Sequence, residues 1–158
     1  MKIIREKKHR LSHENYQGFT IVSYTKCVQE RKRLFTTDQV VEVFEKYLLQ
    51  ELAAGRCDAL VYLFMPDRAH FILQGKTADS NSLDVMYRYS QKTGYWLSKN
   101  YPTFKWQKDF YDHIIRKEED LKKHIYYVLK NPVRQNLVKY WKDYPFKGST
   151  VYSFDEWD

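Results

Sequence analysis

The chain has 158 residues, a length typical of one globular domain, and carries 27 Lys and Arg against 20 Asp and Glu. Its longest apolar run, Ala59 to Met65, is far shorter than the roughly 18 residues that span a bilayer. The basic start of the chain has no apolar segment typical of a secretory signal, and two cysteines suit a reduced compartment. We therefore expect a cytoplasmic globular protein with no membrane partner.

The net charge of +7 is distributed unevenly along the sequence. Residues 1–33 carry a net charge of +6 and residues 88–147 carry +8, whereas residues 34–87 carry −4 and residues 148–158 carry −3. Two basic segments around an acidic one are expected if one face of the fold contacts a polyanion. An ordinary solvated surface explains the same charges equally well.

Four segments have the sequence pattern of β-strands. Alternating, β-rich residues predict strands over Phe19–Cys27 and Phe104–Ile115. Short apolar runs predict two more, over Asp58–Met65 and Ala69–Leu73. The residues between these two, Pro66-Asp67-Arg68, are typical of a turn that joins paired strands.

Helical signals lie between the strands and after the last one. Thr36 and Gln39 have capping-box spacing, with Thr36 as the N-cap, and apolar residues at intervals of four lead to Gly55 at the C′ position. The residue before a proline is disfavoured in a helix, so Asn131-Pro132 is expected to end a helix. Apolar periodicity predicts three further helices, over Ser82–Lys99, Glu118–Lys130 and, as a short one, Val133–Trp141.

The order strand, helix, strand, strand, helix, strand, helix predicts an α+β fold. It is a ferredoxin-like βαββαβ sandwich with an antiparallel sheet and an added C-terminal helix. We expect a basic N-terminal arm over residues 1–15, one domain over residues 16–147, and an acidic aromatic tail over residues 148–158. This fold serves many activities, so the function has to be argued from particular side chains.

The strand Ala69–Leu73 carries the first candidate for chemistry, His70. Because side chains alternate along a strand, His70 and Arg68 are expected on one face while Asp67 points away. A lone histidine on a strand is more often a packed residue than a ligand, so His70 needs a partner from elsewhere in the chain.

The predicted helix Glu118–Lys130 carries the second candidate. With 3.6 residues per turn, Asp120, His124, Tyr127 and Asn131 form one polar stripe beside an apolar face. A tyrosine hydroxyl flanked by His and Asn suits a nucleophile beside a metal ligand. In a chain with fourteen tyrosines, an ordinary packing or interface role explains Tyr127 equally well.

Five segments together resemble the HUH single-tyrosine transposases, in particular the branch of REP-associated tyrosine transposases. The segments occur in the order RLSHENYQGFTIVSYTKC, MPDRAHFIL, WQKDFYDHIIRKEEDL, HIYYVLKNPVRQNLV and WKDYPFKGS. They cover roughly residues 10–149. Their order, and the intact tyrosine-helix segment that ends in NPV, make the resemblance specific.

The resemblance implies both a mechanism and a set of roles. In the family, a His-hydrophobic-His pair and a polar residue four positions after the tyrosine hold Mg²⁺ or Mn²⁺. The tyrosine attacks a backbone phosphate of single-stranded DNA and leaves a 5′-phosphotyrosine and a free 3′-hydroxyl. By resemblance, Tyr127 is the nucleophile, and His70 and Asn131 are metal ligands.

The chain departs from the family pattern at one position, because Arg68 stands in place of the first histidine of the pair. Arginine stays protonated and cannot coordinate a metal, so we expect metal-dependent cleavage to be weak or absent. Asp67, His113 and His124 are the side chains that could replace the lost ligand. A less favoured alternative is that the Arg68 guanidinium clamps the phosphate in place of the cation.

The resemblance further implies a partner, single-stranded DNA that folds into a hairpin. Exposed aromatic rings would stack on unpaired bases, while basic side chains contact phosphates. An alternative is a non-catalytic nucleic-acid-binding domain of the same fold, with its sheet open to RNA or protein, and a homodimer is left open. The candidate DNA contacts are Lys7, Lys8, Arg10, Arg31, Lys32, Arg33, Arg68, His113, Arg116 and Arg134.

Overall fold

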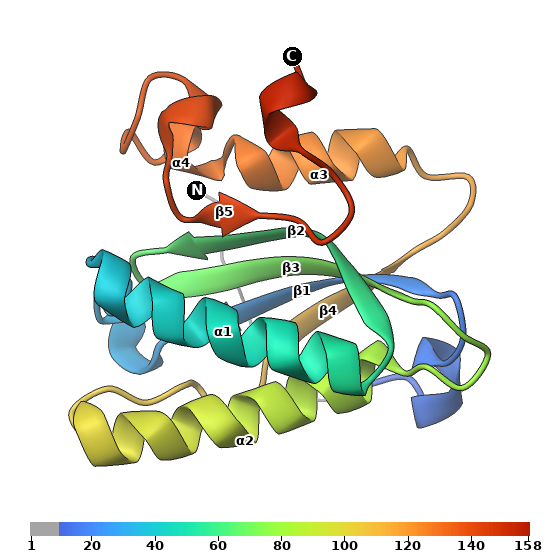
Figure 1. The fold of residues 1–158 in the computed structure, drawn as a ribbon, viewed down its shortest axis with the longest axis horizontal. Helices are drawn as coiled ribbons and strands as arrows, with labels where there is room; N and C mark the ends of the chain where they lie inside the picture. Colours follow the sequence, from blue (N-terminus) through green and yellow to red (C-terminus); the bar gives the residue numbers. More distant parts are fainter. Residues whose placement is uncertain (1–9) are drawn as a thin grey trace.

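A five-stranded antiparallel sheet forms the middle layer of the computed structural model, which describes residues 10–158 (Figure 1). The strand order is β4-β1-β3-β2-β5. The first four strands have the order of a ferredoxin-like βαββαβ fold, so the predicted fold class is confirmed. The strands are β1 Ile21–Cys27, β2 Cys57–Met65, β3 Arg68–Gly75, β4 Tyr111–Ile115 and β5 Lys147–Gly148.

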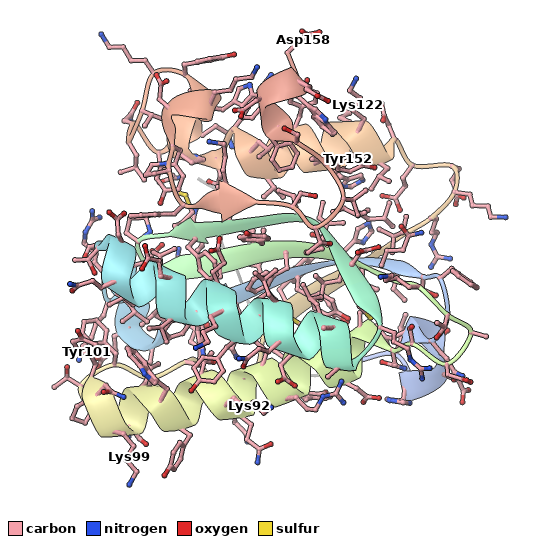
Figure 2. The ribbon with its side chains drawn as sticks, in the orientation of Figure 1. Lys92, Lys99, Tyr101, Lys122, Tyr152 and Asp158 are labelled. Carbon is pink, nitrogen blue, oxygen red and sulfur yellow. The ribbon has the colours of Figure 1, made fainter. Side chains whose placement is uncertain are left out.

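Helices cover both faces of the sheet. The long helices α1 (Asp38–Ala54) and α2 (Ser82–Asn100) cover one face, and α3 (Leu121–Leu129), the single turn α4 (Asn131–Arg134) and the C-terminal residues cover the other (Figure 1). Figure 2 shows the two outer layers through their labelled side chains: Lys92 and Lys99 lie on α2, and Lys122 and Tyr152 lie in the layer of α3. No helix within residues 10–158 combines the length and the apolar character that crossing a membrane requires. Short 3₁₀ turns occur at His13–Tyr16, Gln29–Arg31, Trp141–Asp143 and Phe154–Glu156.

Each face of the sheet has its own hydrophobic core, because the side chains of a strand alternate between faces. On the α1/α2 face, Phe71 of β3 lies edge-on to Phe64 and Tyr89, with ring centroids 6.0 and 5.6 Å apart. On the α3 face, Ile72 of the same strand packs in a cluster that includes Ile125. Fully burying such a side chain stabilises the fold by about 1.5–3 kcal/mol. The alternation also decides which residues of β3 can face α3.

Several predicted boundaries were wrong by one or more residues. The N-cap of α1 is Thr37, whose hydroxyl accepts a 3.4 Å hydrogen bond from the Val40 amide, and not Thr36. Gly55 is the C-cap with φ −89°, so it does not take the left-handed C′ conformation. The helix predicted from Glu118 begins at Leu121, because the Asp120 carboxylate caps it through the Lys123 amide at 3.2 Å.

Two predictions in the last third of the chain were wrong over longer stretches. The strand predicted over Phe104–Ile115 is reduced to β4 (Tyr111–Ile115). The residues before it leave the strand, because Trp106 packs against Phe35 and Phe44 in the core on the α1/α2 face. The helix predicted over Val133–Trp141 is absent, since α4 starts two residues earlier and is followed by Asn136 with φ 61°. Beyond it, β5 pairs with β2 and Phe154 is buried, so the C-terminal residues pack onto the sheet.

Candidate functional site

Three neighbouring strands align the candidate side chains on the sheet face that α3 covers. Thr25 of β1 is the register partner of His70 on β3 and of Tyr111 on β4. Val22, Tyr24 and Phe71 belong to the opposite core, so the alternating residues Thr25, His70 and Arg68 point toward α3. The predicted shared face of Arg68 and His70 is therefore confirmed by the register.

The Arg68 guanidinium lies between His70 and Asn131. Its Nε donates to His70 Nε2 at 3.1 Å and its Nη2 donates to Asn131 Oδ1 at 3.0 Å. Its Nη1 donates to Asp67 Oδ1 at 2.7 Å. Three of the five N–H groups of the guanidinium are thus engaged within the protein, and the side chain is only 8% exposed. Few donors remain for a bidentate clamp on a phosphate.

The hydrogen bonds assign the neutral tautomer of His70. Its Nε2 accepts from Arg68 Nε and from the Asn131 side-chain amide, the latter at 2.8 Å, so Nε2 carries no proton. The proton is therefore on Nδ1, which donates to Thr25 Oγ1 at 3.1 Å. Burial and the charge of Arg68 lower the pKa of His70 to about 3, which keeps the imidazole neutral near pH 7.

These donors and charges do not fit a divalent cation between His70 and Asn131. The two atoms that could ligate it, His70 Nε2 and Asn131 Oδ1, both accept hydrogen bonds from Arg68. The guanidinium has no lone pair to offer and carries a positive charge that repels a second cation. The arginine thus engages the two ligand atoms that the family resemblance assigns to a metal and places a positive charge beside them.

Asp67 does not point away from this cluster, and the expectation drawn from strand alternation was wrong. The strand β3 begins at Arg68, so Asp67 lies in the preceding turn, where the two-residue period does not apply. Its second oxygen accepts a 2.9 Å hydrogen bond from Arg31 Nε. Burial opposes ionisation of Asp67, but the hydrogen bond from Arg31 and the charge of Arg68 hold its pKa below the ordinary value. Asp67 therefore balances the charge of Arg68.

Tyr127 lies on α3 between His124 and Asn131, and its side chain is 52% exposed. The backbone stays helical at Lys130, with φ −87° and ψ 0°, so Asn131 continues the stripe of α3 toward β3. Arg134 stacks on Tyr127, with its guanidinium carbon 3.8 Å from the ring centroid, and its Nη2 donates to the Tyr127 carbonyl at 2.6 Å. This pair places an exposed tyrosine and an exposed cation side by side.

His113 and His124 lie outside the Arg68 cluster and share a different partner. Each Nε2 contacts Glu119 Oε2, at 3.0 Å from His113 and 2.9 Å from His124. The two histidines were identified from the sequence as alternative ligands, whereas Glu119 was not. Its position could not be anticipated, because it depends on the path of the loop between β4 and α3.

The remaining predicted DNA contacts differ in how available they are. Arg33, Arg116 and Arg134 are exposed, whereas Arg10 is 12% exposed on its side chain and lies 4.2 Å from the Phe110 ring centroid. Arg31 pairs with Asp67, and Lys32 donates to the Thr103 carbonyl at 3.0 Å, so both surface cations already have protein partners. Lys7 and Lys8 lie outside the described residues.

Tyr111 is a candidate that the sequence did not single out. It stands on β4 in register with Thr25 and, through Thr25, with His70, and its side chain is 40% exposed. An exposed ring on the open part of this sheet face is suited to stacking on an unpaired base. Side chains alternate between faces along β4, and this signal could have placed Tyr111 on the α3 face if the sequence had predicted that the strand begins at Tyr111.

No protein-family model matches the chain, but comparison with known proteins finds similar ones, among them one similar in sequence and one similar in structure. A Haemophilus influenzae protein named "Putative REP-associated tyrosine transposase" is 27% identical over 136 residues, which cover 79% of this chain and 77% of that protein. A solved structure of a REP-associated tyrosine transposase bound to a REP hairpin has a TM-score of 0.73 at 20% identity, covering 92% of this chain and 82% of that one.

Both matches belong to one class of protein, the tyrosine transposases. The chain is similar to the REP-associated branch of that class, in sequence to the first protein and in fold to the second. The resemblance inferred from the five sequence segments is therefore confirmed.

Proposed function

We propose that this protein binds hairpin-forming single-stranded DNA on the sheet face that carries α3. Its similarity to a transposase whose structure was determined with a REP hairpin supports this assignment. The exposed pair of Tyr127 and Arg134 supplies a hydroxyl and a cation at one place on that face. Tyr111, on the same face, offers a ring for stacking on unpaired bases.

We infer that the tyrosine chemistry of the family is impaired in this chain. In that chemistry the tyrosine oxygen bonds to a DNA phosphorus while the bond to the 3′ oxygen breaks, which leaves a 5′-phosphotyrosine and a 3′-hydroxyl. A phenol is a weak nucleophile at neutral pH and needs a proton acceptor or a cation nearby. The single observation that carries the inference is that Arg68 donates hydrogen bonds to both His70 Nε2 and Asn131 Oδ1. With these atoms occupied, the expected Mg²⁺ or Mn²⁺ has no ligand pair, and DNA binding without efficient cleavage is the resulting activity.

The binding proposal is tested with one hairpin oligonucleotide with single-stranded flanks, its fully duplex form, and the RNA of the same sequence. Gel shifts should give the highest affinity for the DNA hairpin, and the affinity should fall as the salt concentration rises. Equal affinity for all three nucleic acids, or binding insensitive to salt, would contradict the proposal and favour a domain with another partner.

The chemical part is tested in a separate assay. Labelled hairpin DNA is incubated with the protein, with and without Mn²⁺, and covalent adducts are detected after denaturing electrophoresis. The wild-type chain should form little or no adduct, and Tyr127→Phe provides the background level. An efficient Tyr127-dependent adduct in the wild-type protein would show that Arg68 does not prevent cleavage, while leaving the binding proposal intact.

A further inference from the structure

A second group of potential ligands lies on the α3 face, apart from the Arg68 cluster. His113 comes from β4, His124 from α3, and Glu119 from the loop that joins these elements. One ligand atom from each residue lies within 4.8 Å of the other two. The imidazole rings are stacked, with centroids 5.9 Å apart, and all three side chains are partly exposed.

The geometry points to a metal site, and we propose that His113, Glu119 and His124 bind one divalent transition-metal ion. Zinc bonds of about 2.0–2.2 Å in tetrahedral geometry place ligand atoms about 3.3 Å apart. The distances from Glu119 Oε2 to the two Nε2 atoms are 3.0 and 2.9 Å, slightly shorter than this spacing, and one ligand atom of each residue lies within 4.8 Å of the other two. Two imidazoles and one carboxylate are a ligand set that zinc and similar ions use with a coordination position left open.

The Glu119 carboxylate is already oriented for this role. Its other oxygen, Oε1, accepts a 3.2 Å hydrogen bond from the Arg116 backbone amide. The Glu119 amide in turn donates to the Arg116 carbonyl at 3.0 Å, which closes the loop on itself. One oxygen is thus held by the backbone while the other points at both histidines, an arrangement in which outer hydrogen bonds orient a ligand.

The chemistry of the ligands separates this site from a magnesium site. Magnesium prefers oxygen ligands and octahedral geometry, whereas imidazole nitrogens favour zinc, nickel, copper and cobalt. The partial exposure of all three side chains leaves the open position accessible to solvent. There the ion can accept an oxygen ligand, and if the proposed DNA function holds, a backbone phosphate supplies that oxygen.

The experiment is a titration of the full-length, tag-free protein with Zn²⁺ in a calorimeter, followed by Co²⁺ as a visible-absorption probe. We expect one ion per chain, no response to Mg²⁺, and affinity at least about tenfold lower for His113→Ala and His124→Ala. The matched control is His13→Ala, since His13 is an exposed histidine paired with Asp84 at 2.8 Å, outside the cluster. Circular dichroism establishes that each variant is folded, and Glu119→Gln serves as a conservative third variant.

The absence of saturable Zn²⁺ binding, or unchanged affinity in the His113, His124 and Glu119 variants, would overturn the proposal. Hairpin binding is measured on the same samples with and without a chelator. A wild-type protein that binds the hairpin but shows no saturable Zn²⁺ binding rejects the metal site alone. Zinc binding without hairpin binding rejects the proposed DNA function alone.

Discussion

Arg68 donates a 3.0 Å hydrogen bond to the side chain of Asn131, a residue 63 positions away in the sequence. This bond joins the start of β3 to the turn that follows α3, and both residues also contact His70 Nε2. Family chemistry would place a cation among these groups, and the guanidinium brings a permanent charge without a lone pair. The relationship between Arg68 and Asn131 therefore links the one departure in the sequence to the expected loss of activity.

A histidine at position 68 should enable metal-dependent cleavage of DNA by Tyr127. Arg68→His removes the hydrogen bonds from the guanidinium to His70 Nε2 and Asn131 Oδ1, removes its positive charge and adds a third ligand, so Mn²⁺-dependent adduct formation should rise at least about tenfold over wild type. Arg68→Lys is the matched control, because it keeps a positive charge and adds no ligand at neutral pH. Adduct formation that stays at the wild-type level in Arg68→His, with the variant folded, would show that something other than Arg68 limits cleavage.

His70 should make the protein less stable as the pH falls. Its pKa is about 3 in the folded protein against an ordinary value of 6.5, so below pH 6.5 the unfolded chain takes up a proton that the folded protein does not. The free energy of unfolding should then decrease by up to about 1.4 kcal/mol per pH unit as the pH falls from 6.5 toward 3. Urea unfolding at pH 7.0, 6.0 and 5.5 checks this, well above the ordinary pKa of 3.8 for Asp67.

The variant for this pH series is His70→Gln, which keeps a polar side chain but does not titrate. Its unfolding free energy should depend less steeply on pH than that of the wild type, by up to about one proton. Parallel curves for the two proteins would mean that His70 is not held neutral by burial and by Arg68.

Arg134 should contribute to DNA affinity through a phosphate contact. Arg134→Ala should lower hairpin affinity by about tenfold and reduce the dependence on salt by about one phosphate contact, because it removes an exposed cation stacked on Tyr127. Lys99→Ala is the control, since Lys99 lies on α2 in the opposite layer (Figure 2). If both variants bind the hairpin with the affinity of the wild type, the DNA backbone does not contact the surface around Tyr127 and Arg134.

Tyr111 should contribute through stacking on an unpaired base. Tyr111→Ala should weaken binding of a hairpin with single-stranded flanks by about 1–3 kcal/mol, with a much smaller effect on a fully paired duplex. Tyr95→Ala is matched to it, because Tyr95 is 66% exposed but belongs to α2 on the other side of the sheet. Fluorescence anisotropy measures both, and an equal loss of affinity on hairpin and duplex would argue against stacking.

Local patterns predicted much of the fold because they report on short-range physics. Alternation located β1 and short apolar runs located β2 and β3, and since side chains alternate along a strand, the period of two placed Arg68 and His70 together. The same rule failed for Asp67, which lies one residue before the strand begins. It also failed around Trp106, which packs against the core on the α1/α2 face through contacts with Phe35 and Phe44, residues that lie far away in the sequence.

The site was predictable only in part, for the same reason. The stripe of His124, Tyr127 and Asn131 follows from the period of a helix. Glu119 was missed because loop conformation, and not periodicity, brings its carboxylate to His113 and His124. Arg10, expected as a free phosphate contact, instead packs on Phe110, a residue 100 positions away.

The sequence by itself determined the order of β1 to β4 and α1 to α3, the basic character of the chain, and the presence of an arginine where the family that it resembles has a histidine. Only the tertiary structure decided what that arginine does. Asn131 joins Asp67 and His70 around it when α3 and α4 pack on the sheet, and its guanidinium then donates to both candidate ligand atoms. Alternation and helical periodicity cannot predict such an arrangement, because hydrogen bonds between distant segments form only once packing has brought those segments together.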